Sequence, residues 1–271
     1  MTGFAAPQDR AELMEIYDAC FPGERDFCEW LFDGFWRAED TLVLREGGRI
    51  LSAVHIPAFE LALDGEQFPA TYIYAAGTLP AARGRGCMGR LLELSFEESR
   101  RRGHDFSALI TQNDGLFAFY GRFGYLPAFA VGRRKFGAGE LPAGYRLRRA
   151  EPRDAEAMLA LYEREMRGRL APVRSAEWMR LQTELFGETY VLERGAEMLA
   201  YCFGERQEEL LLTELVGAER ELLAAALGPC TAQSPAEGDA APFGCLLPLS
   251  ERGERALRGT RRTPYINLMF N

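Results

Sequence analysis

The residues whose types and spacing point to chemistry occupy positions 83–89, which read Arg-Gly-Arg-Gly-Cys-Met-Gly. They follow an apolar segment at 72–79 that is typical of a buried strand, and they precede a segment in which Leu92 and Phe96 lie four residues apart. A glycine-rich turn that opens a helix binds phosphate well, because the backbone can approach the anion closely and the free N–H groups of the first helical turn point at it. The sequence therefore predicts a site for a phosphate-containing ligand.

The glycine spacing matches more than one class of phosphate site. Gly84-x-Gly86-x-x-Gly89 satisfies the dinucleotide fingerprint literally, which keeps a nicotinamide-dependent oxidoreductase as an alternative. That fingerprint needs an acidic residue about 20 positions later, at the end of the next strand. The next predicted strand, at 106–111, ends without one, and the first acid after it is Asp114. A P-loop nucleotide triphosphatase is disfavoured because no Gly-Lys-Ser or Gly-Lys-Thr follows the glycines.

A glycine-rich turn that binds nothing is the plain alternative. Three arginines, Arg83, Arg85 and Arg90, argue against it, because they would repel one another without an anion between them. Cys87 lies inside the turn, and we expect its side chain to pack beneath the turn rather than to act as a nucleophile.

The pattern Pro-x-x-Arg-Gly-x-Gly at 80–86, with leucines at 91–92, resembles the acetyl-CoA loop of the GCN5-related N-acetyltransferases (GNAT superfamily). The resemblance implies that acetyl-CoA is the co-substrate and that no metal takes part. It implies that the following residues bind the cofactor: Gly77, Thr78, Leu79, Arg83, Gly84, Arg85, Gly86, Cys87, Met88, Gly89 and Asn113.

A second motif follows the next predicted strand, where that superfamily has one. Asn113 is a natural helix N-cap, Tyr120 comes seven residues later, and Gly-Tyr at 124–125 closes the motif. By the resemblance, Tyr120 is catalytic and protonates the departing thiolate. A phenol is a neutral donor with a pKa near 10, which suits that role. The alternative for Tyr120 is a core aromatic residue beside Phe117 and Phe123.

The string Tyr-Gly-Arg-Phe-Gly-Tyr at 120–125 narrows the resemblance to the enhanced-intracellular-survival (Eis-like) branch. Met88 agrees, because that branch has a bulkier residue where most relatives have Gly or Ala. Members of the branch join a catalytic domain to a degenerate copy of the same fold. They typically add a sterol-carrier-like third domain, for which this chain looks too short. Relatives in the branch often assemble, so a homo-oligomer is compatible with the resemblance.

The acetyl transfer requires a base, because an ammonium nucleophile must lose a proton. His55 and Glu60 lie on one predicted strand at 50–63 and are candidates by position. In the branch named above, the base is the C-terminal carboxylate. Here that group belongs to Asn271, at the end of an apolar segment, 264–271, that we predict as a strand.

The two halves of the chain repeat one another. Pro-x-Asp at 7–9 and again at 152–154 opens an amphipathic helix, and a hairpin pattern at 43–52 recurs at 191–200. The offsets of 145 and 148 residues nearly agree. The predicted fold is α/β (α+β), with tandem GNAT folds, each a mixed and mostly antiparallel central sheet flanked by helices.

The second copy lacks the phosphate loop. A strand at 210–216 and a helix at 221–227 are predicted around Gly-Ala-Glu-Arg at 217–220, where Glu219 and Glu221 would repel a pyrophosphate. We therefore expect this copy to have kept the fold and lost the cofactor.

The predicted domains are a catalytic GNAT domain at 1–137 and a degenerate GNAT-like domain at 145–271, joined by a Gly/Pro-rich linker at 138–144. A further loop is predicted at 230–242.

Composition limits the partners. The chain has 271 residues and a net charge of −8, which disfavours nucleic acid and suits a cationic substrate. Six scattered cysteines and two histidines show no metal-ligand spacing, and reduced thiols in the cytoplasm are expected. The N-terminus lacks a signal-peptide pattern, and no apolar stretch is long enough for a membrane helix.

The function predicted is an acetyl-CoA-dependent N-acetyltransferase that moves an acetyl group by direct attack to a primary amine of a small cationic molecule or a protein. Aminoglycosides, polyamines, small amines and protein amines all remain open as acceptors. The alternatives are a non-catalytic acetyl-CoA-binding or sensor protein and a tandem-GNAT aminoacyl or peptidyl transferase.

Overall fold

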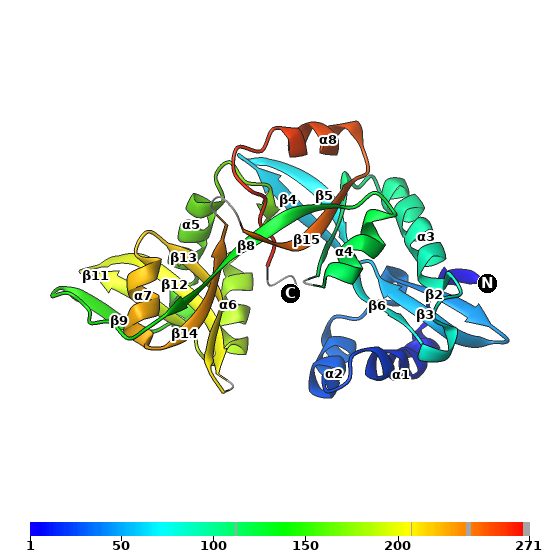
Figure 1. Cartoon of the computed structure of the whole chain (residues 1–271), viewed down its shortest axis with the longest axis horizontal. Helices are drawn as coiled ribbons and strands as arrows, with labels where there is room; N and C mark the ends of the chain where they lie inside the picture. Colours follow the sequence, from blue (N-terminus) through cyan, green and yellow to red (C-terminus); the bar gives the residue numbers. More distant parts are fainter. Residues whose placement is uncertain (112, 207, 237–239, 268–271) are drawn as a thin grey trace.

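The computed structural model describes residues 1–111, 113–206, 208–236 and 240–267, which fold into two halves that share one long sheet (Figure 1). The first half contains β1 (Thr2–Phe4), α1 (Arg10–Cys20), α2 (Arg25–Gly34), β2 (Thr41–Glu46), β3 (Arg49–His55), β4 (Ala58–Leu63), β5 (Glu66–Tyr72), β6 (Tyr74–Thr78), α3 (Cys87–Arg101), β7 (Phe106–Ile110), α4 (Asp114–Gly121) and β8 (Leu126–Phe136). The second half contains β9 (Tyr145–Arg149), α5 (Ala155–Met166), β10 (Ala171–Pro172), α6 (Ala176–Leu185), β11 (Tyr190–Arg194), β12 (Glu197–Arg206), β13 (Leu210–Gly217), α7 (Arg220–Leu227), β14 (Cys230–Pro235), β15 (Ala241–Pro248) and α8 (Glu251–Arg258).

The predicted repeat is present in the structure down to its local hydrogen bonds. A 3₁₀ turn precedes the first helix of each half, and its aspartate side chain accepts from the backbone N–H three residues earlier. In the first half Asp9 accepts from Ala6 at 2.6 Å, and in the second half Asp154 accepts from Glu151 at 2.7 Å. The hairpins β2–β3 and β11–β12 follow, and each has an irregularity in register after a leucine, Leu44 or Leu192. The tandem fold is therefore confirmed.

The strands form two sheets. The smaller sheet has the order β1-β2-β3-β6, and the larger has the order β10-β4-β5-β7-β15-β8-β14-β13-β12-β11-β9. Pairing is mostly antiparallel, with parallel pairs only at β5–β7 and β13–β14 in the described part of the chain. The strand before the glycine-rich turn, β6, pairs antiparallel with β3. A dinucleotide-binding fold needs a parallel strand there, so the nicotinamide alternative loses its structural basis.

The two halves exchange strands. Strand β15 comes from the second half, yet it lies between β7 and β8 of the first half and pairs with both. Strand β8 in turn pairs along its other edge with β14 of the second half. Figure 1 shows β8 running from one half to the other with β15 beside it. Each half thus completes the sheet of the other.

The linker predicted at 138–144 lies within residues 137–144, which form neither helix nor strand between β8 and β9. The division at 138–144 stays a prediction, because the sheet is continuous across it. A further contact across the two halves joins the segment that opens α8 to the start of β7, where Ser250 Oγ donates to Asp105 at 2.5 Å and Arg252 forms an ion pair with the same carboxylate.

The smaller sheet has apolar side chains on both faces, because successive residues of a strand point to opposite sides. Leu42, Leu44 and Val54 pack against α3 on one face. Val43 and Ala53 pack with α1 and α2 on the other face. This arrangement fixes α3, and with it the glycine-rich turn that precedes it, against β2, β3 and β6.

The prediction of a single strand at 50–63 is wrong. The chain instead forms β3 and β4, which belong to different sheets, with Pro57 between them. Proline has no N–H to donate to a ladder, so pairing stops at this position. The neighbouring Ile56 N–H donates to Asp40 O at 2.7 Å and leaves the strand direction.

Two predictions in the second half also need correction. The loop predicted at 230–242 contains β14, whose low strand propensity is overcome by pairing on both sides with β8 and β13. The strand predicted at 264–271 is not formed at 264–267, where the chain is irregular although Tyr265 and Ile266 are fully buried; residues 268–271 lie outside the described part. Within the described residues, no helix is long and apolar enough to cross a bilayer.

Candidate active site

A wedge opens between β6 and β7. Strand β5 pairs with β7 from Ala70 to Tyr72, and the last contact is Ile73 N–H to Ala108 O at 2.8 Å. From Tyr74 onward the chain turns away and joins β3 as strand β6. We call the space between β6 and β7 the wedge. The segment predicted as one strand at 72–79 is therefore two strands, because β5 ends at Tyr72 and β6 begins at Tyr74.

The turn of the chain into β6 is made by an unusual backbone. Ala75 has φ of +44°, and the pairing with β3 shifts register between Ala53 and His55. A left-handed residue other than glycine costs roughly 1–3 kcal/mol and is often found at functional sites. Sequence reasoning missed Ala75, because an alanine gives no signal of a left-handed conformation.

The backbone groups of the predicted cofactor-binding residues at 77–79 point in two directions, toward β3 or toward the glycine-rich turn. Leu79 N–H donates to Leu51 O at 2.9 Å, and Gly77 O accepts from Ser52 Oγ at 2.9 Å, so these groups are used on the β3 side. Thr78 O accepts instead from Arg83 Nε at 3.1 Å, on the side of the glycine-rich turn. Of the three, Thr78 is the one whose carbonyl is directed toward the predicted loop.

The glycine-rich turn, residues 83–89, has the backbone of an anion site. Gly84 and Gly86 both have φ of +74°, and a Cβ at either would meet open space. Arg83 N–H donates to Pro80 O and Arg90 N–H donates to Gly86 O. Across residues 84–89 the N–H groups have no acceptor within the described part of the chain. Unsatisfied N–H groups at a helix N-terminus are the feature that binds phosphate.

The arginines of this turn differ in how they are paired. Arg85 forms an ion pair with Glu46 at 2.6 Å, at the end of β2. Arg90 reaches only the Cys87 sulfur at 3.9 Å. Neither Arg83 nor Arg90 has an acidic partner among the described residues. The repulsion expected among the three is thus partly relieved by Glu46, and two cations remain available.

Three further residues of the turn have packing contacts. Cys87 is buried, with its sulfur 3.7 Å from Ala82 O, as predicted for a side chain beneath the turn. Gly89 lies under Phe123, since a Cβ there would be 3.1 Å from the ring. Met88 is partly buried in the same cluster. Gly89 is therefore explained by close packing of α3 on the segment after α4.

The second motif is placed at the wedge. Asn113 caps α4, as predicted, and its side chain accepts from Gly115 N–H at 2.9 Å. Tyr120 on α4 is buried, with ring centroids 5.2 Å from Phe119 and 5.6 Å from Tyr125. Its hydroxyl has no hydrogen-bond partner within the described residues. Burial raises the pKa of Tyr120 to about 12, so it is a neutral donor at physiological pH.

The second half contributes to this site through β15. Cys245 on that strand lies in the same apolar cluster as Tyr120, and burial raises the pKa of its thiol to about 11. Gly124 packs on Leu247 of β15. Apart from the carboxylate of Asn271, the sequence analysis placed the site in residues 1–137 and missed these neighbours, because strand exchange leaves no local signal.

A cavity of about 510 Å³ lies beside β6, beneath α2. Its lining comes from α2 and the turn after it, from β3, β4 and β5, and from Tyr74 at the start of β6: Leu31, Gly34, Phe35, Trp36, Arg37, Asp40, Thr41, His55, Pro57, Ala58, Phe59, Tyr72 and Tyr74. Tyr72 and Tyr74 flank the point where the wedge opens. The cavity and the wedge are therefore adjacent.

His55 is held in this cavity in one tautomer. Thr41 Oγ1 donates to Arg37 O at 2.9 Å and accepts from Trp36 Nε1 at 3.0 Å, and it lies 2.9 Å from His55 Nδ1. A hydroxyl has a single proton, so the proton in the Thr41–His55 contact must come from Nδ1. The neutral ring then carries its lone pair on Nε2. Burial lowers the pKa of His55 to about 4, which keeps the ring neutral.

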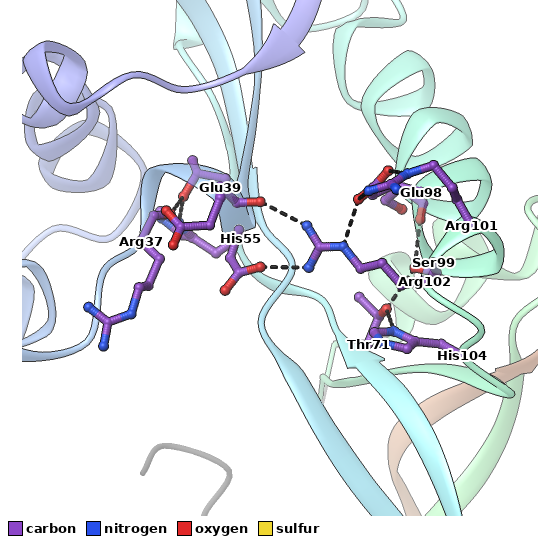
Figure 2. Close-up of polar contacts among 12 residues, drawn as sticks. Arg37, Glu39, His55, Thr71, Glu98, Ser99, Arg101, Arg102 and His104 are labelled. Carbon is purple, nitrogen blue, oxygen red and sulfur yellow. Dashed lines mark hydrogen bonds and ion pairs between the residues drawn. The ribbon is translucent and has the colours of Figure 1, made fainter.

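The other candidate bases are placed less favourably or lie outside the described residues. Glu60 is exposed on β4 and does not line the cavity. Asn271 lies outside the described residues. The second histidine, His104, bonds to Thr71 at 2.6 Å and does not line the cavity (Figure 2). Among the described residues, no three potential metal-ligating side chains gather.

In the second half, β13 and β14 also separate, and there the gap beside β13 is occupied by Asn267. Strand β13 pairs with β14 only from Leu210 to Leu212, and beyond it Thr213 O accepts from the Asn267 side chain at 2.5 Å. The C-terminal segment thus occupies the place that the wedge leaves open in the first half. Glu219 precedes α7, and Glu221 pairs with Arg134 at 2.5 Å, where the first half has its glycine-rich turn.

Comparisons with known proteins agree with this geometry. Residues 4–128 match the family model described as an acetyltransferase (GNAT) domain. Solved structures with the same fold include a GCN5-related N-acetyltransferase from Kribbella flavida, at 18% identity and a TM-score of 0.71, covering 93% of this chain and 73% of that one. Eis1 from Mycobacterium abscessus matches at 16% identity and a TM-score of 0.66, with 92% and 74% covered.

A tandem GNAT protein from the clavulanic acid biosynthesis pathway matches at 13% identity and a TM-score of 0.57, covering 92% of this chain and 99% of that one. At sequence identities of 13–18%, the similarity to these structures establishes the fold of this chain and nothing beyond it. A comparison with curated proteins found no match. Residues 4–128 therefore match a GNAT domain, and the whole chain has the fold of a tandem GNAT protein.

Proposed function

We propose that the chain is an acetyl-CoA-dependent N-acetyltransferase that transfers the acetyl group directly to a primary amine. The observation that carries this proposal is the wedge, which opens beside a helix N-terminus with unsatisfied N–H groups; Tyr120 packs in one apolar cluster with Ile73 and Leu109, which lie where it opens. A thioester cofactor has an anionic pyrophosphate, an extended amide-bearing arm and a sulfur, and the three features match these three parts. The likeness in fold to Eis1 supports membership of the enhanced-intracellular-survival branch.

The cofactor would lie along β6. The N–H groups of residues 84–89 would bind the pyrophosphate, and Arg83 would add charge, since it has no acidic partner among the described residues. Thr78 would receive the pantetheine arm, because its carbonyl faces away from β3. Arg85 is paired with Glu46 and would contribute less than its position in the motif implies.

Tyr120 would act on the sulfur of the cofactor. With a pKa near 12, its phenol remains protonated at all working pH values. Full proton transfer to a thiolate with an ordinary pKa near 8.5 would be uphill by roughly 5 kcal/mol at that difference. The hydroxyl therefore serves first as a hydrogen-bond donor to the developing thiolate, and the proton follows as the thiolate leaves the site.

The base is proposed to be His55, which lines the cavity beside the wedge and has its acceptor atom at Nε2. Its rival is the C-terminal carboxylate of Asn271. Mutations distinguish these two candidate bases. His55→Asn keeps a donor toward Thr41 and removes Nε2, whereas removal of residues 270–271 moves the C-terminal carboxylate two residues back along the chain. A base at His55 predicts that only the first change lowers turnover; the opposite pattern would assign the base to the C-terminus.

The second half is proposed to be a degenerate, non-catalytic domain. Its opening beside β13 holds Asn267, and acidic residues flank the start of α7. It supports the first half through β15, which completes the sheet behind Tyr120. One acetyl-CoA per chain is the expected stoichiometry.

The proposal is tested by turnover with acetyl-CoA and a panel of amines: an aminoglycoside, a polyamine, small primary amines and a protein with free lysines. Release of the CoA thiol that depends on the amine, with an acetyl group gained by the amine, is the expected result. Acetyl-CoA binding without turnover on a broad panel would favour the sensor alternative. No binding of acetyl-CoA would refute the proposal.

A further inference from the structure

The cavity beneath α2 has an aromatic wall. Five aromatic residues line it in addition to His55: Phe35, Trp36, Phe59, Tyr72 and Tyr74. The rings of Tyr72 and Tyr74 are stacked with centroids 5.9 Å apart, and Phe59 meets Tyr72 edge-on at 6.0 Å. Walls of this kind bind flat or bulky apolar groups, because aromatic rings give large contact areas at fixed geometry.

A single available cation lies at the edge of this cavity. Arg37 is exposed in the turn between α2 and β2, and within the described residues its guanidinium has no acidic partner. Figure 2 shows its side chain extending away from the neighbouring group of ion pairs. A guanidinium with five donors and no partner matches a planar carboxylate, which it binds through two parallel hydrogen bonds.

The one acid in the cavity lining is already neutralised. Asp40 accepts from Arg102 at 2.6 Å, and the same arginine donates to Glu39 O at 2.8 Å and to Glu98 at 2.7 Å (Figure 2). This network ties the turn after α2 to α3 and holds Asp40 away from a ligand. Arg37 is therefore the one charged residue of the cavity lining without an ion-pair partner among the described residues.

His55 is the third feature of the cavity that could select a substrate, after the aromatic wall and Arg37. Thr41 fixes its tautomer, so Nε2 is the acceptor atom of the neutral ring, and His55 lines the cavity with its ring centroid 6.4 Å from that of Tyr74. An acceptor that binds a primary amine by its N–H and lies beside the thioester is placed for attack.

We infer that the acceptor of the acetyl group is a primary amine that carries a carboxylate and an aromatic or similarly bulky apolar group, as an aromatic amino acid does. Arg37 binds the carboxylate, the aromatic wall binds the apolar group, and His55 accepts from the amine. This inference rests on the proposed acetyltransferase function and specifies its substrate class. It differs from the cationic acceptor expected from the net charge, because local groups outweigh distant charges that are screened beyond about 10 Å.

The ammonium form of the acceptor first loses one proton to solvent. The neutral amine then attacks the carbonyl carbon of the thioester, the C–N bond forms and the C–S bond breaks. One amine proton passes to Nε2 of His55. The departing thiolate is stabilised by Tyr120 and leaves as the thiol, and the proton on His55 restores the phenol through solvent. The products are an N-acetylated amino acid and free CoA.

The test compares amines that differ only in the carboxylate. Phenylalanine is compared with phenethylamine, and tyrosine with tyramine, by amine-dependent thiol release from acetyl-CoA with the full chain. We expect kcat/KM to be about 10- to 100-fold higher for the carboxylated member of each pair, the factor typical of a hydrogen bond to a charged group. Arg37→Met should remove this preference, and Arg37→Lys should keep part of it. Arg146→Met, at another exposed arginine with no acidic partner among the described residues, is the matched control and should change nothing.

The outcomes separate the substrate class from the proposed function. Equal use of both members of each pair, or a preference that survives Arg37→Met, would overturn the inference while turnover itself upheld the acetyltransferase. Acetyl-CoA binding with none of the four amines acetylated would also overturn the inference. Failure to bind acetyl-CoA would refute the proposed function instead.

Discussion

Replacement of Tyr120 by phenylalanine removes one hydroxyl and leaves its ring packing in place. The hydroxyl has no hydrogen-bond partner among the described residues, so its loss should change the free energy of unfolding by less than about 0.5 kcal/mol. In the transition state it would be the donor to a developing thiolate, and loss of such a donor lowers kcat by about 10²- to 10³-fold, or roughly 3–4 kcal/mol. Steady-state thiol release and urea unfolding measure the two effects.

Tyr125 provides the matched control. Its hydroxyl lies 2.6 Å from Ser107 Oγ, and both side chains are buried. Tyr125→Phe leaves the serine without its partner and should cost about 1–3 kcal/mol in the free energy of unfolding, with little effect on kcat at a temperature where the protein is folded. Equal kcat for wild type and Tyr120→Phe, or a loss of stability in place of a loss of rate, would refute the role given to Tyr120.

Three further predictions follow from the charges. Glu46→Gln releases Arg85 from its surface ion pair, so calorimetry should find the acetyl-CoA Kd lowered by up to about 5-fold; an unchanged or raised Kd would show that Arg85 does not contact the cofactor. Burial lowers the pKa of His55 to about 4, so the folded protein binds fewer protons than the unfolded chain below pH 6.5, and stability should fall as pH drops from about 6.5 to 4. This group contributes up to about 3 kcal/mol of that loss, and urea unfolding should find a smaller loss in His55→Asn; an identical loss would contradict the assignment. Arg174→Met leaves Glu214 buried without its bidentate partner and should cost about 3–5 kcal/mol in the free energy of unfolding, with wild-type stability as the contradicting result.

The repeated elements could be predicted because their signals are local. The Pro-x-Asp turns, the hairpins and the capped helix at Asn113 each depend on residues within a few positions of one another. The tandem fold followed from the common offset between these signals. The glycine-rich turn also has a local signal, because its two left-handed positions are occupied by glycines, Gly84 and Gly86.

The exchange of strands could not be predicted in this way. Strand β15 pairs with β7, more than 130 residues earlier in the chain, and the sequence of residues 241–248 does not indicate which strand they pair with. Residues 230–235 read as a loop and became a strand because two neighbouring strands supply ladder partners. Long-range pairing decided both cases, and sequence pattern carries little information about it.

The cavity was missed for a related reason. His55 was a candidate by its position on a strand, but its tautomer depends on Thr41, Trp36 and the carbonyl of Arg37, which no spacing rule links to it. Arg37 gave no signal of its own, since exposed arginines are common in this sequence. Arg37 is distinguished by lining the cavity without an acidic partner among the described residues, which only the structure reveals.

Calorimetric titration of the full chain with acetyl-CoA, with NADH as the control ligand, tests the central claim most directly. The account predicts one acetyl-CoA site per chain and no binding of NADH, because the wedge of the first half is open and its counterpart in the second half holds Asn267. Two acetyl-CoA sites per chain would contradict the account of the second half. Binding of NADH without acetyl-CoA would contradict the assignment of the wedge and the glycine-rich turn.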